Sequence, residues 1–147
     1  MANKVLSPTA WTRRLQVTTS VYSVVTTIGT ALVLGYITPE LLLARTDIAP
    51  SDIDGFLVGF RITGIAFLLL NAVGIAALWD KAWVFWTILA TDLFQGIGFF
   101  FVDWPGTGLR GLGILGTYLT DVGGGILGLV LLGFALRYRT AWAYQRH

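Results

Sequence analysis

The sequence contains no cysteine, and its single histidine is His147. The absence of cysteine excludes disulfides, thiolate metal sites and cysteine nucleophiles. One histidine cannot supply a set of histidine ligands to zinc, and we expect neither haem ligation nor a histidine-based catalytic triad. We therefore expect no metal and no redox cofactor, and any chemistry must use carboxyl, hydroxyl, amide or guanidinium groups.

Charged residues are also scarce. They make up 12% of the 147 residues, and hydrophobic residues make up 55%. A soluble domain usually has about a quarter charged residues. A nucleic-acid-binding face needs clustered basic residues with aromatics among them, and the few lysines and arginines here do not form one. The composition predicts an integral membrane protein and excludes nucleic-acid binding.

Four apolar segments are each long enough to span a bilayer as a helix of about 20 residues. They cover residues 15–37, 55–78, 82–102 and 109–136. The connections between them are short, which favours antiparallel neighbours. We therefore expect an all-α fold, a polytopic membrane protein whose single domain, residues 1–147, is a four-transmembrane-helix up-down-up-down bundle.

The distribution of basic residues predicts the orientation in the membrane. Seven of the ten basic residues lie before the first segment, in the second connection or after the fourth segment: Lys4, Arg13, Arg14, Lys81, Arg137, Arg139 and Arg146. The first connection is instead acidic. Cytoplasmic loops carry an excess of lysine and arginine. We expect a multi-pass protein of the cell membrane with both termini in the cytoplasm.

The third segment contains an aspartate in an apolar and aromatic run, "ILATDLFQGIGFFF". Asp92 would lie near the middle of the bilayer, where an unpaired charge costs at least ~2.5–3.5 kcal/mol. Helical spacing puts Gln95 and Phe99 on the same face as Asp92. Polar faces of membrane helices turn towards the bundle, so we expect Asp92 to face the interior.

The other segments also have polar or small faces. The spacing of the second segment groups Arg61 with Asn71, and that of the fourth places Tyr118 beside Asp121. The first segment has a hydroxyl stripe of Thr19, Ser23, Thr26 and Thr30. A rise of about 1.5 Å per residue puts Arg61, Asp92 and Asp121 at similar depths in the outer half.

An Asp/Arg/Asp cluster of this kind predicts acid–base chemistry. Arg61 is the natural partner for one carboxylate, and the surplus negative charge favours a proton on the other. Which aspartate would hold it stays open. The candidate catalytic residues are Asp92, Asp121 and Arg61, and the candidate substrate-binding residues are Gln95, Tyr118, Asn71 and Phe99. The competing interpretation is that the cluster only locks the helices together.

Two stretches, "GFRITGIAFLLL" in the second segment and "ILATDLFQG" in the third, resemble the small DoxX-like four-helix membrane proteins. The resemblance extends over most of the chain, from about Leu32 to Leu136. It implies a four-helix membrane fold and leaves the activity open, because most proteins of that set have no known function. Asp121 and the glycine triplet that follows it have no counterpart in the family pattern.

Two classes of function are compatible with these residues. The first is an isomerase, cyclase or epoxide-opening enzyme, or a binder, that acts on a lipophilic small molecule by acid–base chemistry. The alternative is a proton-coupled transporter or channel, or an accessory membrane subunit, in which the cluster is a proton site or structural glue. The expected partners are a lipophilic small molecule and membrane lipid, and we expect a monomer or a parallel homodimer.

Overall fold

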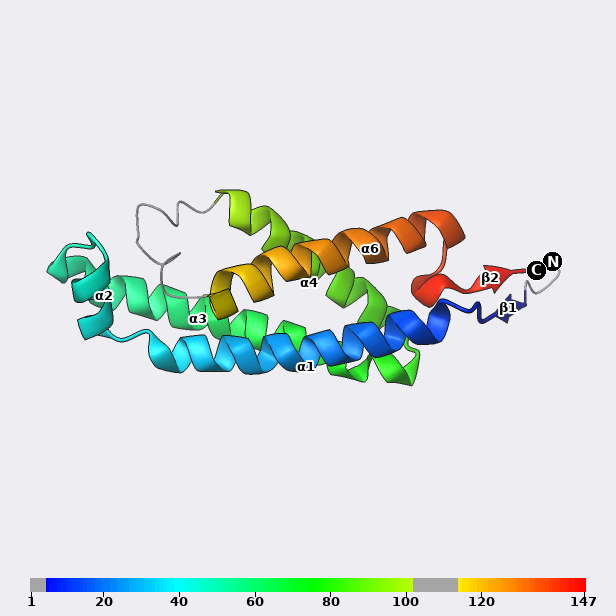
Figure 1. Ribbon diagram of the computed structural model, residues 1–147, viewed down its shortest axis with the longest axis horizontal. Coiled ribbons are helices and arrows are strands. Elements are labelled where there is room, and N and C mark those ends of the chain that lie inside the picture. Colours follow the sequence, from blue (N-terminus) through cyan, green and yellow to red (C-terminus); the bar gives the residue numbers. More distant parts are fainter. Residues whose placement is uncertain (1–4, 102–113) are drawn as a thin grey trace.

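The computed structural model describes residues 5–101 and 114–147. Its four long helices are shown in Figure 1. They are α1 (Thr12–Tyr36), α3 (Ile53–Val73), α4 (Ala82–Phe101) and α6 (Gly123–Tyr138). Four helical stretches, some of which continue beyond these α-helices, are long and apolar enough to cross a membrane: Thr12–Tyr36, Pro50–Trp79, Ala82–Phe99 and Tyr118–Tyr138. The all-α prediction with four spanning helices is confirmed.

Two of the expected helices are not uniform α-helices. The second continues from α3 into a 3-10 helix, η2 (Gly74–Trp79), and the fourth begins with a π-helix, η4 (Ile114–Val122), before α6. A π-helix bonds residue i to i+5, is rare in proteins, and is frequently found at functional sites. The third connection and the first residues of the expected fourth segment, 103–113, lie outside the described residues.

Both described ends of the chain lie at the same end of the bundle, beside the turn between η2 and α4 (Figure 1). Strand β1 (Leu6–Ser7) pairs antiparallel with β2 (Gln145–Arg146). The short helix η5 (Ala141–Ala143) places Trp142 so that its Nε1 donates to the Lys81 carbonyl at 3.0 Å. We call this the terminal end. The sequence predicted this grouping of the termini with the second connection.

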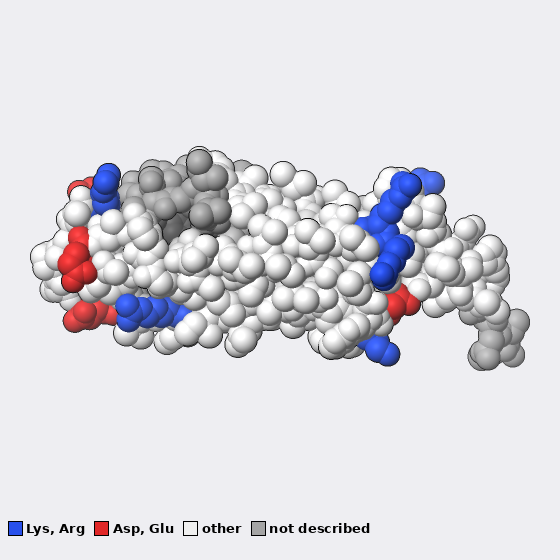
Figure 2. All heavy atoms as spheres, turned by 60° about the horizontal axis from the view of Figure 1, so that its bottom comes forward, with Lys and Arg blue, Asp and Glu red and all other residues white. Residues whose placement is uncertain are grey.

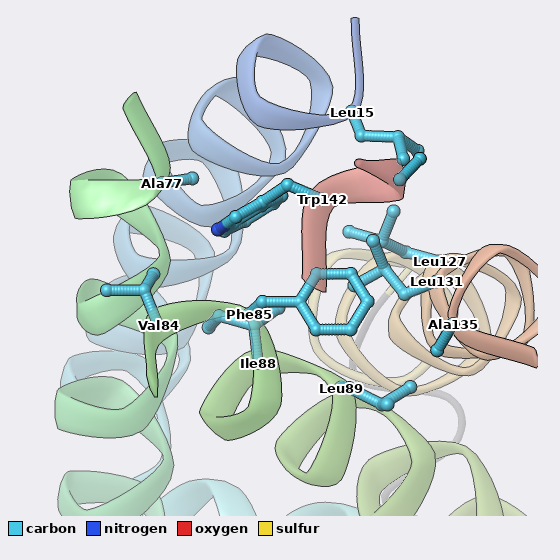
Figure 3. Packing of buried hydrophobic residues seen from close by; sticks show 11 residues of the cluster. Leu15, Ala77, Val84, Phe85, Ile88, Leu89, Leu127, Leu131, Ala135 and Trp142 are labelled. Carbon is cyan, nitrogen blue, oxygen red and sulfur yellow. The ribbon is translucent and has the colours of Figure 1, made fainter. Parts of the chain in front are cut away.

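Trp142 closes the bundle at the terminal end. Its side chain is buried and meets the Phe85 ring edge-on, with ring centroids 5.1 Å apart. Figure 3 shows Trp142 beside Phe85, with Leu15 of α1 and Leu131 of α6 lining the same cluster. A buried tryptophan contributes one of the largest apolar areas of any side chain. The segment after α6 is therefore part of the core.

The opposite end carries the connection from α1 to α3. It contains the short helix α2 (Pro39–Arg45) and a 3-10 turn, η1 (Pro50–Asp52). Thr38 caps α2, because its side chain accepts a hydrogen bond from the Leu41 amide at 3.3 Å. A second, smaller apolar cluster holds this end together: Ile37, Leu42, Ile53 and Leu57.

On the face shown in Figure 2, charged side chains gather at the two ends of the molecule and leave a wide uncharged band between them. Large apolar side chains cover the outer faces of the long helices. Exposed examples are Val21, Ile62, Leu69, Phe94, Ile126 and Leu129. A soluble monomer rarely exposes so much contiguous apolar surface. The surface is that expected of a multi-pass membrane protein.

The orientation of the two ends is testable because the chain has no cysteine of its own. We expect a membrane-impermeant maleimide to label Asp47→Cys, which lies in the connection after α2, on intact cells. Lys81→Cys, exposed at the terminal end, is the matched control. It should react only after permeabilisation, because the excess of lysine and arginine predicts that this end faces the cytoplasm. The reverse pattern would contradict the predicted orientation.

Candidate functional site

Helices α4 and α6 cross in direct backbone contact. A Cβ added at Gly96 would lie 2.6 Å from the Gly125 Cα, and one added at Gly125 would lie 2.9 Å from the Gly96 Cα. One added at Gly128 would lie 2.9 Å from the backbone nitrogen of Leu93. Only glycine permits these distances, which is the close packing that small residues allow between membrane helices.

Asp92 and Gln95 lie beside this crossing and face α6. Their exposed fractions are 2% and 6%. A Cβ added at Gly124 would lie 3.5 Å from Asp92 Oδ1 and 3.4 Å from Gln95 Oε1, so both side chains reach the surface of that glycine. The prediction that Asp92 faces the bundle interior is confirmed. Asp92 Oδ2 is buried and has no hydrogen-bond partner among the described residues.

Asp121 enters the same region from the π-helix η4. It is half-buried, and its Oδ1 accepts a hydrogen bond from Thr120 Oγ1 at 3.1 Å. Two residues before Asp121, the Leu119 carbonyl accepts a hydrogen bond from the Tyr22 hydroxyl of α1. The Tyr22 ring also lies against Gly123, where an added Cβ would be 3.2 Å from Tyr22 Cζ, and the next residue, Gly124, adjoins Asp92. Tyr22 therefore brings the two carboxyl groups and α1 into one site.

Tyr22 was not among the residues that the sequence selected. The sequence feature that could have indicated Tyr22 is its position three residues after Thr19, which places it next to the hydroxyl stripe of α1. Its ring also explains why a glycine suits position 123, because a Cβ added there would lie 3.2 Å from Tyr22 Cζ. The sequence suggested packing against the glycines of the fourth helix but gave no reason to choose this aromatic side chain.

Asn71 lies at the level of Asp92. Its exposed fraction is 2%, and its Nδ2 has no partner among the described residues. Near it, a Cβ added at Gly74, the first residue of η2, would lie 2.8 Å from Ile88 Cδ1, so α4 touches the chain directly after α3. Asn71 is about one turn before Gly74, and Asp92 is about one turn after Ile88. Because α3 and α4 run in opposite directions (Figure 1), both steps lead to the same level.

These buried and half-buried groups form what we call the inner polar cluster: Tyr22, Asn71, Asp92, Gln95 and Asp121. It joins α1, α3, α4 and η4. The cluster offers two carboxyl groups, a phenol and two amides inside an apolar bundle. Such groups can orient the polar part of a ligand by hydrogen bonds, and a carboxyl group can exchange a proton with it. Within the described residues, no three His, Cys, Asp or Glu side chains gather to hold a metal ion.

Arg61 is not part of the inner polar cluster. Its side chain is exposed on α3, and the described residues include no ion pair between it and either aspartate. The expected Arg61–carboxylate contact is therefore corrected. Arg61 and Asn71 are ten residues apart, and at 3.6 residues per turn their directions differ by roughly 80° around the helix axis. The sequence-based grouping added successive three- and four-residue spacings as if each returned to the same face, so it missed the accumulated rotation.

Tyr118 and Phe99 lie beside each other. Tyr118 is 52% exposed, and its ring centroid is 6.3 Å from that of Phe99, which is half-buried. The predicted grouping of Tyr118 with Asp121 assumed an α-helix. In the wider π-helix, three residues cover less of a turn, so the two side chains diverge.

The α4–α6 crossing gives a direct test of packing. We expect Gly96→Ala to lower the free energy of unfolding by about 1–3 kcal/mol, because the new methyl group would overlap the Gly125 backbone. Gly98→Ala is the control on the same helix, since a Cβ there meets nothing within 4 Å. Thermal unfolding in detergent measures both. Equal stability of the two variants would show that α4 and α6 do not meet at these glycines.

Comparison with family models, with curated proteins and with solved structures finds no match for the chain. The inner polar cluster and the helices that surround it are therefore the grounds on which a function can be inferred.

Proposed function

We propose that this protein binds a lipophilic small molecule inside its helical bundle, with the polar group of that molecule at Asp92. The observation that carries the proposal is the buried Asp92 Oδ2, which has no hydrogen-bond partner among the described residues. Buried polar atoms nearly always have a partner, and leaving one unsatisfied costs about 1–3 kcal/mol. A ligand hydroxyl would supply the missing donor, and a ligand carbonyl or epoxide oxygen would accept from Oδ2 when the carboxyl group holds a proton there.

The unpaired amide nitrogen of Asn71 supports the same proposal. It lies at the level of Asp92 and offers a donor, whereas a carboxyl group offers an acceptor and, when it holds a proton, also a donor. Together they suit an oxygen-bearing ligand. The surrounding apolar side chains, such as Ile88, suit its hydrocarbon part.

We further propose acid–base chemistry at this site. Asp92 would donate a proton to an alkene, epoxide or carbonyl of the ligand, and Asp121 would accept a proton from a neighbouring carbon of the same molecule. The ligand gains one proton and loses another, so the reaction is an isomerisation or a cyclisation and needs no oxidant. Two carboxyl groups in different surroundings are suited to these two roles.

The alternative, a proton-coupled transporter or channel, also has one supporting observation. The buried face of α1 is largely polar from the terminal end to mid-helix: Thr12, Gln16, Thr19, Ser20, Ser23 and Thr26. Beyond this stretch α1 becomes apolar, from Ala31 to Leu34. A transport path must reach both sides, so a polar face that ends in mid-membrane favours a binder or enzyme entered from one side.

The relation to the DoxX-like proteins, the cytoplasmic location of both termini and a monomer or parallel homodimer as the working form also stay proposals. The inner polar cluster lies within one chain, so a monomer is sufficient to form the proposed site. A dimer that left this cluster unchanged would be compatible with the same function.

Asp92→Asn tests the proposed function. The amide keeps the shape of the side chain but cannot donate a carboxyl proton, so we expect the protein to lose its bound small molecule or its turnover. Its thermal stability should stay the same or rise, because the described residues give Oδ2 no partner to lose. The measurements are thermal unfolding in detergent and mass spectrometry of small molecules extracted from the purified protein.

Asp47→Asn, in the connection after α2 and far from the cluster, is the control and should change neither quantity. If Asp92→Asn unfolds several degrees earlier while its folded fraction retains the same small molecules, Asp92 has a structural role, and the proposed function is wrong.

A further inference from the structure

A row of aromatic rings lies between two arginines at the terminal end. The Arg14 guanidinium lies over the Trp11 ring at 5.3 Å, and the Trp11 ring is 5.3 Å from that of Phe134. Phe134 stacks on Tyr138 at 6.0 Å, and the Arg137 guanidinium lies 5.7 Å from the Tyr138 ring. We call these five residues the arginine–aromatic row. It joins the start of α1 to the end of α6.

The two arginines have no acidic partner in the described part of the chain. Both are exposed. The acidic side chain of the adjacent turn, Asp80, is already engaged, because Oδ1 accepts from Gln16 Nε2 at 2.6 Å and Oδ2 accepts from the Tyr144 hydroxyl. The latter bond raises the pKa of Tyr144 to about 12, as expected for a phenol that donates to a carboxylate. The described residues therefore supply neither arginine with a carboxylate counter-ion.

The row lies at the boundary between charged and uncharged surface. Figure 2 shows lysine and arginine side chains in a band where the uncharged middle of the molecule ends. Apolar side chains continue from the row along α6, with Val130 and Leu136 both exposed. Arginine matches phosphate oxygens in a bidentate geometry, and aromatic rings settle at the depth of the headgroups.

We propose that the arginine–aromatic row is a binding site for an anionic phospholipid of the leaflet at the terminal end. The lipid phosphate binds the guanidinium of Arg14 or Arg137, and the acyl chains lie along the rings of Trp11 and Phe134. The exposed ring of Trp11, 45% accessible, gives the hydrocarbon a surface that a free phosphate ion would not use. This site is separate from the inner polar cluster and does not depend on its proposed function.

Native mass spectrometry tests the proposal. The full chain is reconstituted in an equimolar mixture of phosphatidylcholine and phosphatidylglycerol, and the phosphatidylglycerol molecules retained on the released protein are counted. We expect the double variant Arg14→Gln/Arg137→Gln to retain about tenfold less, the change that corresponds to losing one charge-assisted hydrogen bond. Phosphatidylcholine retention should not change.

The matched control is Arg13→Gln/Arg139→Gln. It removes the same number of charges from the same ends of the same two helices, but outside the row. It should retain phosphatidylglycerol as the unsubstituted protein does. Equal loss in both double variants would show a general charge effect and overturn the proposal. Displacement of the lipid by inorganic phosphate would also overturn it, by showing a site for a soluble anion.

A third variant tests the rings. Phe134→Leu keeps an apolar side chain and both arginines but removes the ring that joins Trp11 to Tyr138. We expect weaker retention of phosphatidylglycerol at unchanged net charge, with thermal unfolding used to confirm that the variant is folded. Unchanged retention in the folded variant would contradict a role for the aromatic row.

Discussion

The backbone contact between α4 and α6 at Gly96 and Gly125 determines where the polar side chains of this bundle can lie. In a membrane, lipid is as apolar as the helix surfaces, so close packing and hydrogen bonds must bring the helices together. The contact presses the Asp92–Gln95 face of α4 against Gly124. A side chain at Gly96 or Gly125 would overlap the backbone of the other helix and force the two helices apart at the level of Asp92.

The second constraint is the polar interior that this packing encloses. Tyr22 links α1 to η4 through the Leu119 carbonyl, and Asn71 brings α3 to the level of Asp92. Arg61, the cation that the sequence suggested as a partner for a carboxylate, is exposed outside this interior. An unpaired carboxyl group is costly in a low-dielectric medium. A ligand explains its presence better than a lock between helices, because a lock requires a partner on a neighbouring helix and the described residues give Asp92 Oδ2 none.

Long apolar segments were sufficient to predict the four helices, because their length and composition alone meet the requirement for spanning a bilayer. The inward direction of Asp92 was also predictable, since lipid penalises the alternative. The exposed position of Arg61 was not predictable in this way, because small deviations from the helical repeat accumulate over the ten residues between Arg61 and Asn71. The π-helix before α6 was equally hidden, and it altered the directions of Tyr118 and Asp121. Trp142 joined the core through a left-handed backbone conformation, φ 56°, that periodicity does not reveal.

The central claim is that the hydrogen-bond partner of Asp92 Oδ2 is a bound small molecule and not a group of the protein. A crystal structure grown from a lipidic mesophase, with the protein purified without added ligand, tests this claim most directly. We predict non-protein electron density within hydrogen-bonding distance of Asp92 Oδ2, on the side that faces Asn71. A structure in which Oδ2 instead binds a protein group, such as the Asn71 amide or the Arg61 guanidinium, with no such density beside it, would contradict the claim.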